Sequence, residues 1–370
     1  MHLTRRRFLA RVAGAAVAAT PALVAAGAAL ATLRPARAGW TPDLRARSVR
    51  RIVPPLATMV GEVFRVRRTI PARGVDQVDP FIMLDHFDFT LAPGELGGLA
   101  PHPHRGFETV TVLAEGAIEH GDSLGNRGRL EAGGVQWMTA ASGIVHEENP
   151  DDSVREKGGR IHGIQLWVNL PQRSKMEPPR YQLAETSANP SVPPEPRDMS
   201  SGRSSRGRGP AGSPQGTRAF RIPEGGEGGA TVRVIAGAIE ELSALIDTHT
   251  PMLLADWTLA PGAEAVVAHP AGWTGFVHVI DGVVTVGGQP VGDGHCAVMA
   301  DDGDAIVMRN DGPRPARALL GGGEPIAEPL ARYGPFAMNT RAELEQAVDD
   351  YRSGRMGAVA NPTYDRIRRR

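Results

Sequence analysis

Two short motifs carry the residues of this sequence best suited to bind a metal ion. The first, Pro-His-Pro-His, contains His102 and His104, and the second, His-Glu-Glu, contains His146 and Glu148. Residues two apart in an extended strand share a face, so each pair can aim at one point inside a barrel, while Glu147 points away. Three imidazoles and one carboxylate suit a divalent ion with open positions, such as iron(II), manganese, copper or nickel. Closed structural zinc sites favour cysteine ligands, and this chain contains one cysteine.

The other candidate ligands carry weaker signals. Glu108, at the start of the strand that follows the first histidine motif, is a rival acid to Glu148. We expect the remaining histidines of the first half to be loop or packing residues: His86, His120 and His162. The histidines of the second half form no His-x-His pair: His249, His269, His278 and His295. The sequence therefore predicts one metal site per chain.

The stretches around these motifs have the pattern of short antiparallel strands. Residues 108–114 alternate threonine and valine, and 134–140 and 161–168 are further apolar, β-branched or aromatic runs. The 45 glycines and 31 prolines favour short elements joined by turns. Strands at this spacing without intervening helices are typical of a sandwich or barrel.

A faint internal repeat indicates a second barrel. Residues 276–286 resemble 109–119, and 294–300 can be laid over 134–140. On this alignment the position of His146 falls near Val307 or Met308, neither of which suits a hard metal ion. The second barrel is therefore expected to be chemically silent. A single helix is predicted at 340–352, which is followed by a glycine stop.

The N-terminus resembles an export signal. Residues 4–9 hold paired arginines before an apolar pair, 12–33 are uncharged and rich in Ala and Gly, and 36–38 read Ala-Arg-Ala. We expect cleavage of a twin-arginine signal, because Pro21 and the weak apolarity of Ala and Gly disfavour a stable membrane anchor. Removing the six arginines of residues 1–38 from 41 basic residues leaves 35 against 41 acidic ones, which does not invite nucleic acid.

These observations divide the chain into four parts. The division is 1–38, signal peptide; 50–184, a barrel with the metal site; 185–229, an insertion rich in Pro, Gly, Ser and Arg; and 230–354, a barrel without metal plus the C-terminal helix. We expect the insertion to be disordered, because it has almost no apolar residues to bury. The predicted fold class is all-β, with two tandem antiparallel barrels of the jelly-roll type.

Several motifs resemble those of the pirin family. They are Asp79-Pro-Phe-Ile-Met-Leu-Asp85, Pro101-His-Pro-His-Arg-Gly-Phe-Glu-Thr109, Gln136-Trp-Met-Thr-Ala140, Gly143-Ile-Val-His146-x-Glu148, Gly163-Ile-Gln-Leu-Trp-Val168 and Gly334-Pro-Phe-Ala-Met-Asn-Thr340. The resemblance runs from about 60 to 352, apart from the insertion. It implies a bicupin with one metal, usually iron, in the N-terminal barrel and with ligands at His102, His104, His146 and Glu148. The chain departs from the family pattern in its signal, its insertion and Ala141-Ser142, where many members have Gly-Arg.

The resemblance also implies an activity. Some bacterial pirins are quercetin 2,3-dioxygenases, which open a flavonol ring with dioxygen, and Glu148 then serves as ligand and possible base for the flavonol hydroxyl. We therefore expect iron(II), with manganese, copper, nickel or zinc as alternatives, and a small aromatic substrate and dioxygen as partners of a periplasmic monomer. The alternative is a non-enzymatic binding protein that responds to metal or redox state. Sugar isomerisation, known among cupins, is disfavoured by the motif set.

Overall fold

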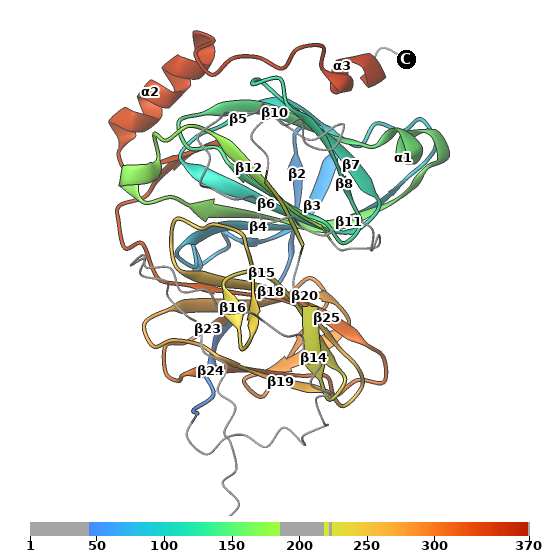
Figure 1. Cartoon of the computed structure of the whole chain (residues 1–370), viewed down its shortest axis with the longest axis vertical. Helices are drawn as coiled ribbons and strands as arrows, with labels where there is room; N and C mark the ends of the chain where they lie inside the picture. The colour runs from blue at the N-terminus through green and yellow to red at the C-terminus, as the bar shows by residue number, and fades with distance from the viewer. Residues whose placement is uncertain (1–43, 186–217, 222–223, 369–370) are drawn as a thin grey trace, which may run out of the picture. The chain divides into compact units, whose positions relative to one another are not determined.

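The computed structural model describes residues 44–185, 218–221 and 224–368, which form two units. Unit 1 contains 44–53 and 224–325, and unit 2 contains 54–185, 218–221 and 326–368. Each unit consists of a large and a small β-sheet, and nearly all strand pairs are antiparallel (Figure 1). The all-β, two-barrel prediction is therefore confirmed. No helix in the described ranges is long and apolar enough to cross a membrane, and the predicted signal at 1–38 lies outside these ranges.

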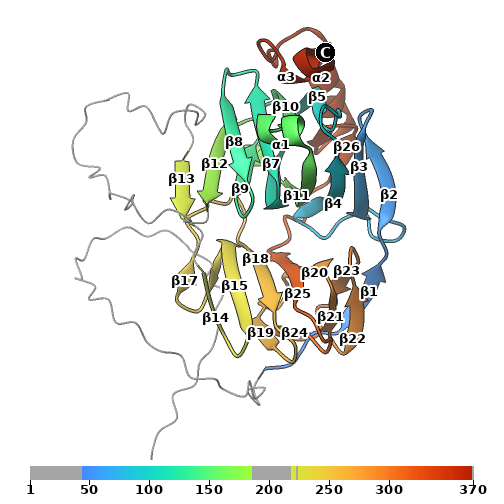
Figure 2. The same ribbon diagram turned by 90° about the vertical axis from the view of Figure 1, so that its right-hand side faces the viewer.

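Unit 2 carries the histidine motifs on its smaller sheet. The order of that sheet is β5-β10-β7-β8, with β5 (Leu99–His104), β7 (Ala117–Asp122), β8 (Arg127–Glu131) and β10 (Ile144–Pro150). The larger sheet has the order β13-β12-β9-β6-β11-β4-β3-β2, with β2 and β13 at its edges (Figure 2). Its strands are β2 (Leu56–Val60), β3 (Phe64–Ile70), β4 (Phe81–Leu91), β6 (Phe107–Glu115), β9 (Val135–Thr139), β11 (Gly159–Asn169), β12 (Arg180–Glu185) and β13 (Arg218–Arg221). The strands predicted at 108–114, 134–140 and 161–168 are β6, β9 and β11.

Unit 1 repeats this topology. Its larger sheet has the order β1-β23-β20-β25-β18-β15-β14 and its smaller sheet the order β19-β24-β21-β22. The strands are β1 (Val49–Val53), β14 (Glu224–Glu227), β15 (Ala230–Ala236), β18 (Met252–Leu259), β19 (Glu264–Ala268), β20 (Thr274–Asp281), β21 (Val283–Val286), β22 (Gln289–Gly292), β23 (Cys296–Met299), β24 (Ala305–Arg309) and β25 (Ala316–Gly323), with a β16–β17 hairpin (Ala238–Ile239, Leu242–Ser243). Thus β23-β20-β25-β18-β15 corresponds to β9-β6-β11-β4-β3, and the repeat predicted from sequence is confirmed.

The C-terminal segment belongs to unit 2. It contains β26 (Ala331–Tyr333), β27 (Phe336–Met338), α2 (Arg341–Arg352) and α3 (Thr363–Arg368). A capping box between Thr340 and Glu343 starts α2, whose buried Leu344 and Ala347 pack in one cluster with Val145 of β10. The helix predicted at 340–352 is therefore confirmed, but it belongs to unit 2, whereas the sequence division grouped it with the second barrel. The other helices are α1 (Asp152–Lys157) and the 3-10 turn η1 (Gln172–Ser174).

Two more boundaries differ from the sequence division. β1, placed by sequence in the first domain, pairs with β23 of unit 1. The segment 185–229, predicted to be disordered, contains β13, which pairs with β12, and β14, which pairs with β15. Backbone pairing, which does not require apolar side chains, orders the end of this segment. Residues 186–217 lie outside the described ranges.

Candidate metal centre

Pairing between β5 and β10 brings the three predicted histidine ligands together. His102 lies directly opposite His146 in the antiparallel register, and His104 lies two residues farther along β5 on the same face. The imidazole centroids are 4.4 Å apart for His102–His146, 4.8 Å for His102–His104 and 4.9 Å for His104–His146. One nitrogen from each ring lies within 4.8 Å of the others. Among the described residues, this is the only cluster with such metal-ligating geometry.

Each imidazole uses Nδ1 for a contact to the protein and leaves Nε2 for a ligand. Nδ1 of His102 lies 2.8 Å from the Ala100 carbonyl oxygen, and Nδ1 of His104 lies 3.4 Å from that of Pro335. Nδ1 of His146 lies 3.4 Å from Nδ1 of His120, and its buried Nε2 has no hydrogen-bond partner. Such contacts orient metal-binding histidines, and a buried nitrogen without a partner fits one that coordinates an ion.

The electrostatics of the cluster also suit a cation. Burial lowers the pKa of His104 and His146 well below the usual imidazole range, and the neighbouring imidazoles lower it further. Burial lowers the pKa of His102 as well, against the opposing effect of the Glu148 carboxylate. The three rings are therefore neutral near pH 7, and a neutral ring keeps the lone pair that binds a metal.

The two candidate acids occupy different places. The three-histidine cluster does not include Glu148, whose two carboxylate oxygens accept hydrogen bonds from the amide Nε2 of Gln165 at 3.1 and 3.0 Å. Glu148 nevertheless lies two residues from His146 on β10, so its role as ligand or base stays a prediction. Glu108 is buried and accepts a hydrogen bond from Thr139. The next residue, Thr109, lies directly opposite Trp167, which lines the cavity, so Thr109 points to the inner face of the sheet. Neighbouring residues of a strand point to opposite faces, and Glu108 therefore faces away from the cluster.

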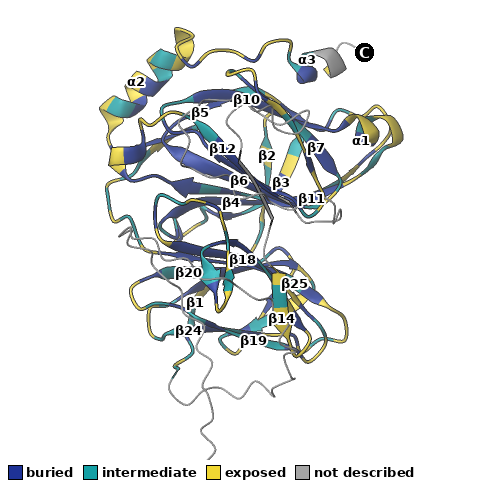
Figure 3. Ribbon diagram, viewed as in Figure 1, coloured by how far each residue is buried: buried dark blue, intermediate teal, exposed yellow. Residues whose placement is uncertain are grey.

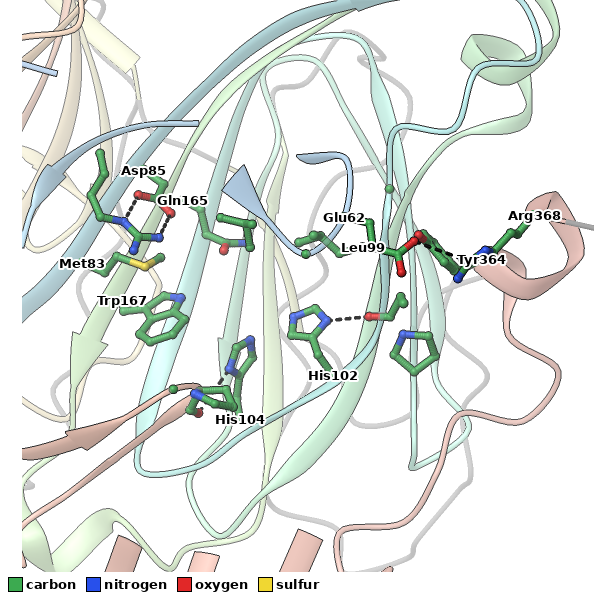
Figure 4. A pocket seen from close by; sticks show the side chains of 18 residues that line it. Glu62, Met83, Asp85, Leu99, His102, His104, Gln165, Trp167, Tyr364 and Arg368 are labelled. Carbon is green, nitrogen blue, oxygen red and sulfur yellow. Dashed lines mark hydrogen bonds and ion pairs between the residues drawn. The ribbon is translucent and has the colours of Figure 1, made fainter. Parts of the chain in front are cut away.

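A cavity of about 360 Å³ adjoins His102 and His104 (Figure 4). Its apolar wall includes Leu99, Met83 and Trp167, and the Trp167 ring lies edge-on to His104 at 5.2 Å. Its polar lining residues are Glu62, Arg68, Asp85, Gln165 and Arg368. Two residues come from α3: Tyr364, which is buried, and Arg368, whose Nη2 lies 3.3 Å from the Glu62 carboxylate. The cavity can hold a flat, largely apolar ligand beside the imidazoles.

Sequence reasoning missed two residues near the cluster: His120, which contacts His146, and Gln165, which contacts Glu148. His120, expected to be a loop or packing residue, is buried on β7 between His146 and Asp122, whose Oδ2 lies 3.9 Å from its Nε2. If His146 coordinates through Nε2, its Nδ1–H donates to His120, which directs its own N–H toward Asp122. The spacing in β11 could have revealed Gln165, because it lies two residues from Trp167 and therefore points to the same face of the strand.

Glu147, predicted to point away from the cluster, does so. Its buried carboxylate accepts hydrogen bonds from the backbone N–H groups of Thr363 (2.8 Å) and Tyr364 (3.0 Å) at the start of α3. The strand that carries His146 therefore also holds the segment that supplies Tyr364 to the cavity wall.

Unit 1 has no equivalent cluster among its described residues. The strands β19 and β24 correspond to β5 and β10 when their inward-facing pairs are aligned. Ala265 then occupies the position of His102, and Val267 occupies that of His104. Met308 occupies the position of His146. These residues belong to the apolar core of unit 1. The buried faces of both units are visible in Figure 3. Apolar side chains therefore fill the position of the site in unit 1.

The relatives of this chain agree with the motifs and the geometry. Residues 63–168 match the Pirin family model, and residues 254–357 match that of the Pirin C-terminal cupin domain. Pirin-1 of Arabidopsis thaliana is 36% identical over 301 residues, which cover 80% of this chain and 90% of that protein. Pirin of Homo sapiens is 35% identical over 298 residues, which cover 79% and 88%. The crystal structure of a quercetin 2,3-dioxygenase from Acinetobacter baumannii is similar at a TM-score of 0.71 and 30% identity, over 85% of this chain and all of that one. The chain belongs to the pirin family.

Proposed function

We propose that this pirin is a metal-dependent dioxygenase that opens the ring of a flavonol or a related enediol-type aromatic. The observation that carries the proposal is the set of three neutral imidazoles beside a largely apolar cavity, those of His104 and His146 buried and that of His102 half-buried, with no hydrogen-bond partner for Nε2 of His146 among the described residues. The similar Acinetobacter baumannii structure is that of a quercetin 2,3-dioxygenase, which supports this reaction class. A single redox-active divalent ion, iron(II) in our proposal, would supply Lewis-acid and dioxygen chemistry.

The side chains around the cluster have defined tasks in this proposal. Glu148, oriented by two hydrogen bonds from Gln165, accepts the proton of the substrate hydroxyl on a carboxylate oxygen. Trp167 and Met83 provide an apolar wall for the aromatic rings and exclude water from the reacting oxygens. His120 holds His146 in one orientation.

We also propose that the protein acts outside the cytoplasm. The proposal rests on the twin-arginine pattern of residues 4–9 and the small residues at 36 and 38. The direct check is N-terminal sequencing of the protein recovered from the periplasm, which we expect to begin at Gly39. Recovery only from the cytoplasm with Met1 intact would refute export.

The test of the function combines metal analysis with oxygen uptake. Protein loaded anaerobically with iron(II) should bind about one equivalent and consume dioxygen when quercetin is added. A His104→Ala variant should lose both properties. A His295→Ala variant should keep both, because His295 lies in unit 1, where its Nδ1 is 3.0 Å from the Asp293 carbonyl oxygen.

The alternative function gives a different pattern. A non-enzymatic metal or redox-responsive binding protein would bind one ion through His102, His104 and His146 but would consume no dioxygen with a panel of flavonols. Absence of metal from both the native protein and the variant would refute the site itself.

A further inference from the structure

A row of polar side chains crosses the inner face of the larger sheet of unit 2. Arg68 on β3 lies directly opposite Asp85 on β4, and Asp85 lies directly opposite Gln165 on β11. Opposed residues of antiparallel strands point to the same face, and all three side chains line the cavity beside His102 and His104. Gln165 continues the row to Glu148 by hydrogen bonds. The row therefore joins the metal centre to a charged pair in the same cavity.

The charged pair fixes a guanidinium and leaves part of it unused. Arg68 donates from Nε and Nη2 to the two carboxylate oxygens of Asp85, at 2.6 Å each. An arginine has five N–H groups, so this fork occupies two of them. The remaining three have no hydrogen-bond partner within the described part of the chain. The Asp85 side chain is 4% exposed, whereas that of Arg68 is 25% exposed and lines the cavity.

Stability alone is a poor explanation for this pair. Burial raises the pKa of the Asp85 carboxyl, and the Arg68 hydrogen bonds and charge act against that effect. The ion pair is thus held in a place that disfavours charge, where an apolar pair of similar size is often equally stable or more so. The adjacent row on the same face is indeed apolar, with Trp167 directly opposite Met83.

The surroundings define what the guanidinium can meet. Trp167 and Met83 form an apolar surface next to the polar row, and the Trp167 ring contacts His104. In Figure 4, Trp167 and Met83 lie near Asp85, on the side of the cavity opposite Glu62 and Arg368. A flat ring laid on Trp167 can therefore have one edge toward the imidazoles and another toward the charged pair. Its outer edge would need an oxygen acceptor to use the open N–H groups.

We propose that Arg68, oriented by Asp85, selects aromatic substrates that carry an oxygen acceptor, a hydroxyl or phenolate, on the ring remote from the metal-binding oxygens. The inference deepens the proposed function and rests on it for the identity of the metal-binding end. Arg68 is in this scheme a specificity-determining residue: it binds the substrate and takes no part in bond breaking. If Arg68 served only to hold β3 against β4, its replacement would not change the discrimination between ligands.

The test compares two flavonols in direct binding measurements. Quercetin carries hydroxyl groups on both outer rings, whereas 3-hydroxyflavone carries none on them, and both offer a 3-hydroxyl and a 4-carbonyl oxygen to a metal. Affinities are measured by fluorescence titration, without dioxygen, on the protein loaded with a redox-inactive divalent ion. Arg68→Met should weaken quercetin about tenfold or more, the effect of losing a hydrogen bond to a charged donor, and should leave 3-hydroxyflavone unchanged. Arg65→Met, which removes an exposed charge from the same strand, should change neither affinity.

Two further variants separate recognition from folding. Arg68→Lys keeps the charge opposite Asp85 but lacks the fork, and should lose part of the preference for quercetin. The double variant Arg68→Met with Asp85→Leu leaves no unpaired buried charge and should lose the preference as fully as Arg68→Met. Equal weakening of both ligands, or no weakening, would overturn the role of Arg68 and leave the proposed function intact. Failure of the unmodified protein to bind either flavonol would overturn both.

Discussion

Glu147 is the residue through which β10, the strand that carries His146, holds the C-terminal segment, and its replacement by glutamine provides a direct test. The side chain is 1% exposed. One carboxylate oxygen accepts from the Thr363 N–H at 2.8 Å, and the other accepts from the Tyr364 N–H at 3.0 Å and from Asn149 at 3.1 Å. Glutamine has the same shape but presents one oxygen and one NH₂ group. One backbone N–H at the start of α3 must therefore face another donor.

The magnitude follows from the contact that is lost. A hydrogen bond to a charged group contributes about 1.5–3 kcal/mol, and a buried donor left without an acceptor costs a similar amount. The ion pair from Arg127 to Glu147 adds little, because the Arg127 side chain is 45% exposed. We expect Glu147→Gln to weaken docking of the C-terminal segment by about 2–3 kcal/mol. This corresponds to about a 30- to 150-fold rise in the population of the undocked segment.

Hydrogen exchange measured by mass spectrometry reports this population locally. The peptide that contains Thr363 and Tyr364 should exchange faster by that factor, whereas peptides from α2 and from the β5–β10 pair should keep their rates. The matched control is Glu345→Gln on α2, whose side chain is 64% exposed and pairs with Arg341 on the surface. Unchanged exchange of the Thr363–Tyr364 peptide in Glu147→Gln would refute the clamp, and faster exchange everywhere would show that Glu147 supports the whole unit instead.

Two further predictions concern other buried polar groups of unit 2. Gln165→Leu removes the two hydrogen bonds that the Gln165 amide donates to the Glu148 carboxylate. We expect kcat to fall about tenfold, with iron content and quercetin affinity unchanged. Loss of iron would instead mean that Gln165 supports the histidine cluster itself. Lys175 is buried among three oxygen acceptors, from Gly106, Asn169 and Ala337, and burial lowers its pKa to about 8 despite Glu328 and Glu343. In the unfolded chain Lys175 keeps its proton up to about pH 10.5, so between pH 8 and 10.5 the unfolded state binds more protons than the folded state. The free energy of unfolding should therefore rise with pH, by about 2 kcal/mol between pH 7 and 9.5. Denaturant titrations of the native protein and Lys175→Met should show this rise only in the native protein, and an identical rise in both would exclude Lys175 as its source.

Local patterns were sufficient to predict the histidine cluster. The two-residue period in a strand is a steric property of the extended chain, so His102 and His104 had to share a face wherever β5 was placed. The repeat in unit 1 was also readable, because each barrel needs the same alternation and the same turns. Neither inference required knowledge of which strands pair.

What the sequence could not provide depends on long-range pairing. Glu148 satisfies the period with His146, but its hydrogen bond from Gln165, which reaches it from the other sheet, could not be read from the period. The register also shifts between the two strands, with Glu148 opposite Leu99 and His146 opposite His102. Placement of α2 and α3 on unit 2 depends on contacts such as Glu147–Thr363, which join residues 216 positions apart. Local sequence preferences do not predict contacts between residues so far apart in the chain.

The two units show how one topology can hold a site in one copy and a filled core in the other. In unit 1 the inward-facing positions of β19 and β24 are Ala265, Val267, Ile306 and Met308, and they pack in a continuous apolar cluster. In unit 2 the equivalent strands place imidazoles there, and the facing sheet adds Arg68, Asp85 and Gln165. Each such exchange gives up apolar burial and requires desolvation of a polar group, so it reduces the stability that the barrel could otherwise reach. On the larger sheet, the polar groups that line the cavity of unit 2 form one connected row from Arg68 to Gln165, whereas Glu62 and Arg368 pair on the opposite side of the cavity. A connected row of this kind is what the proposed ligand-binding role of Arg68 predicts, with Arg68 at one end and Glu148, two residues from His146, at the other.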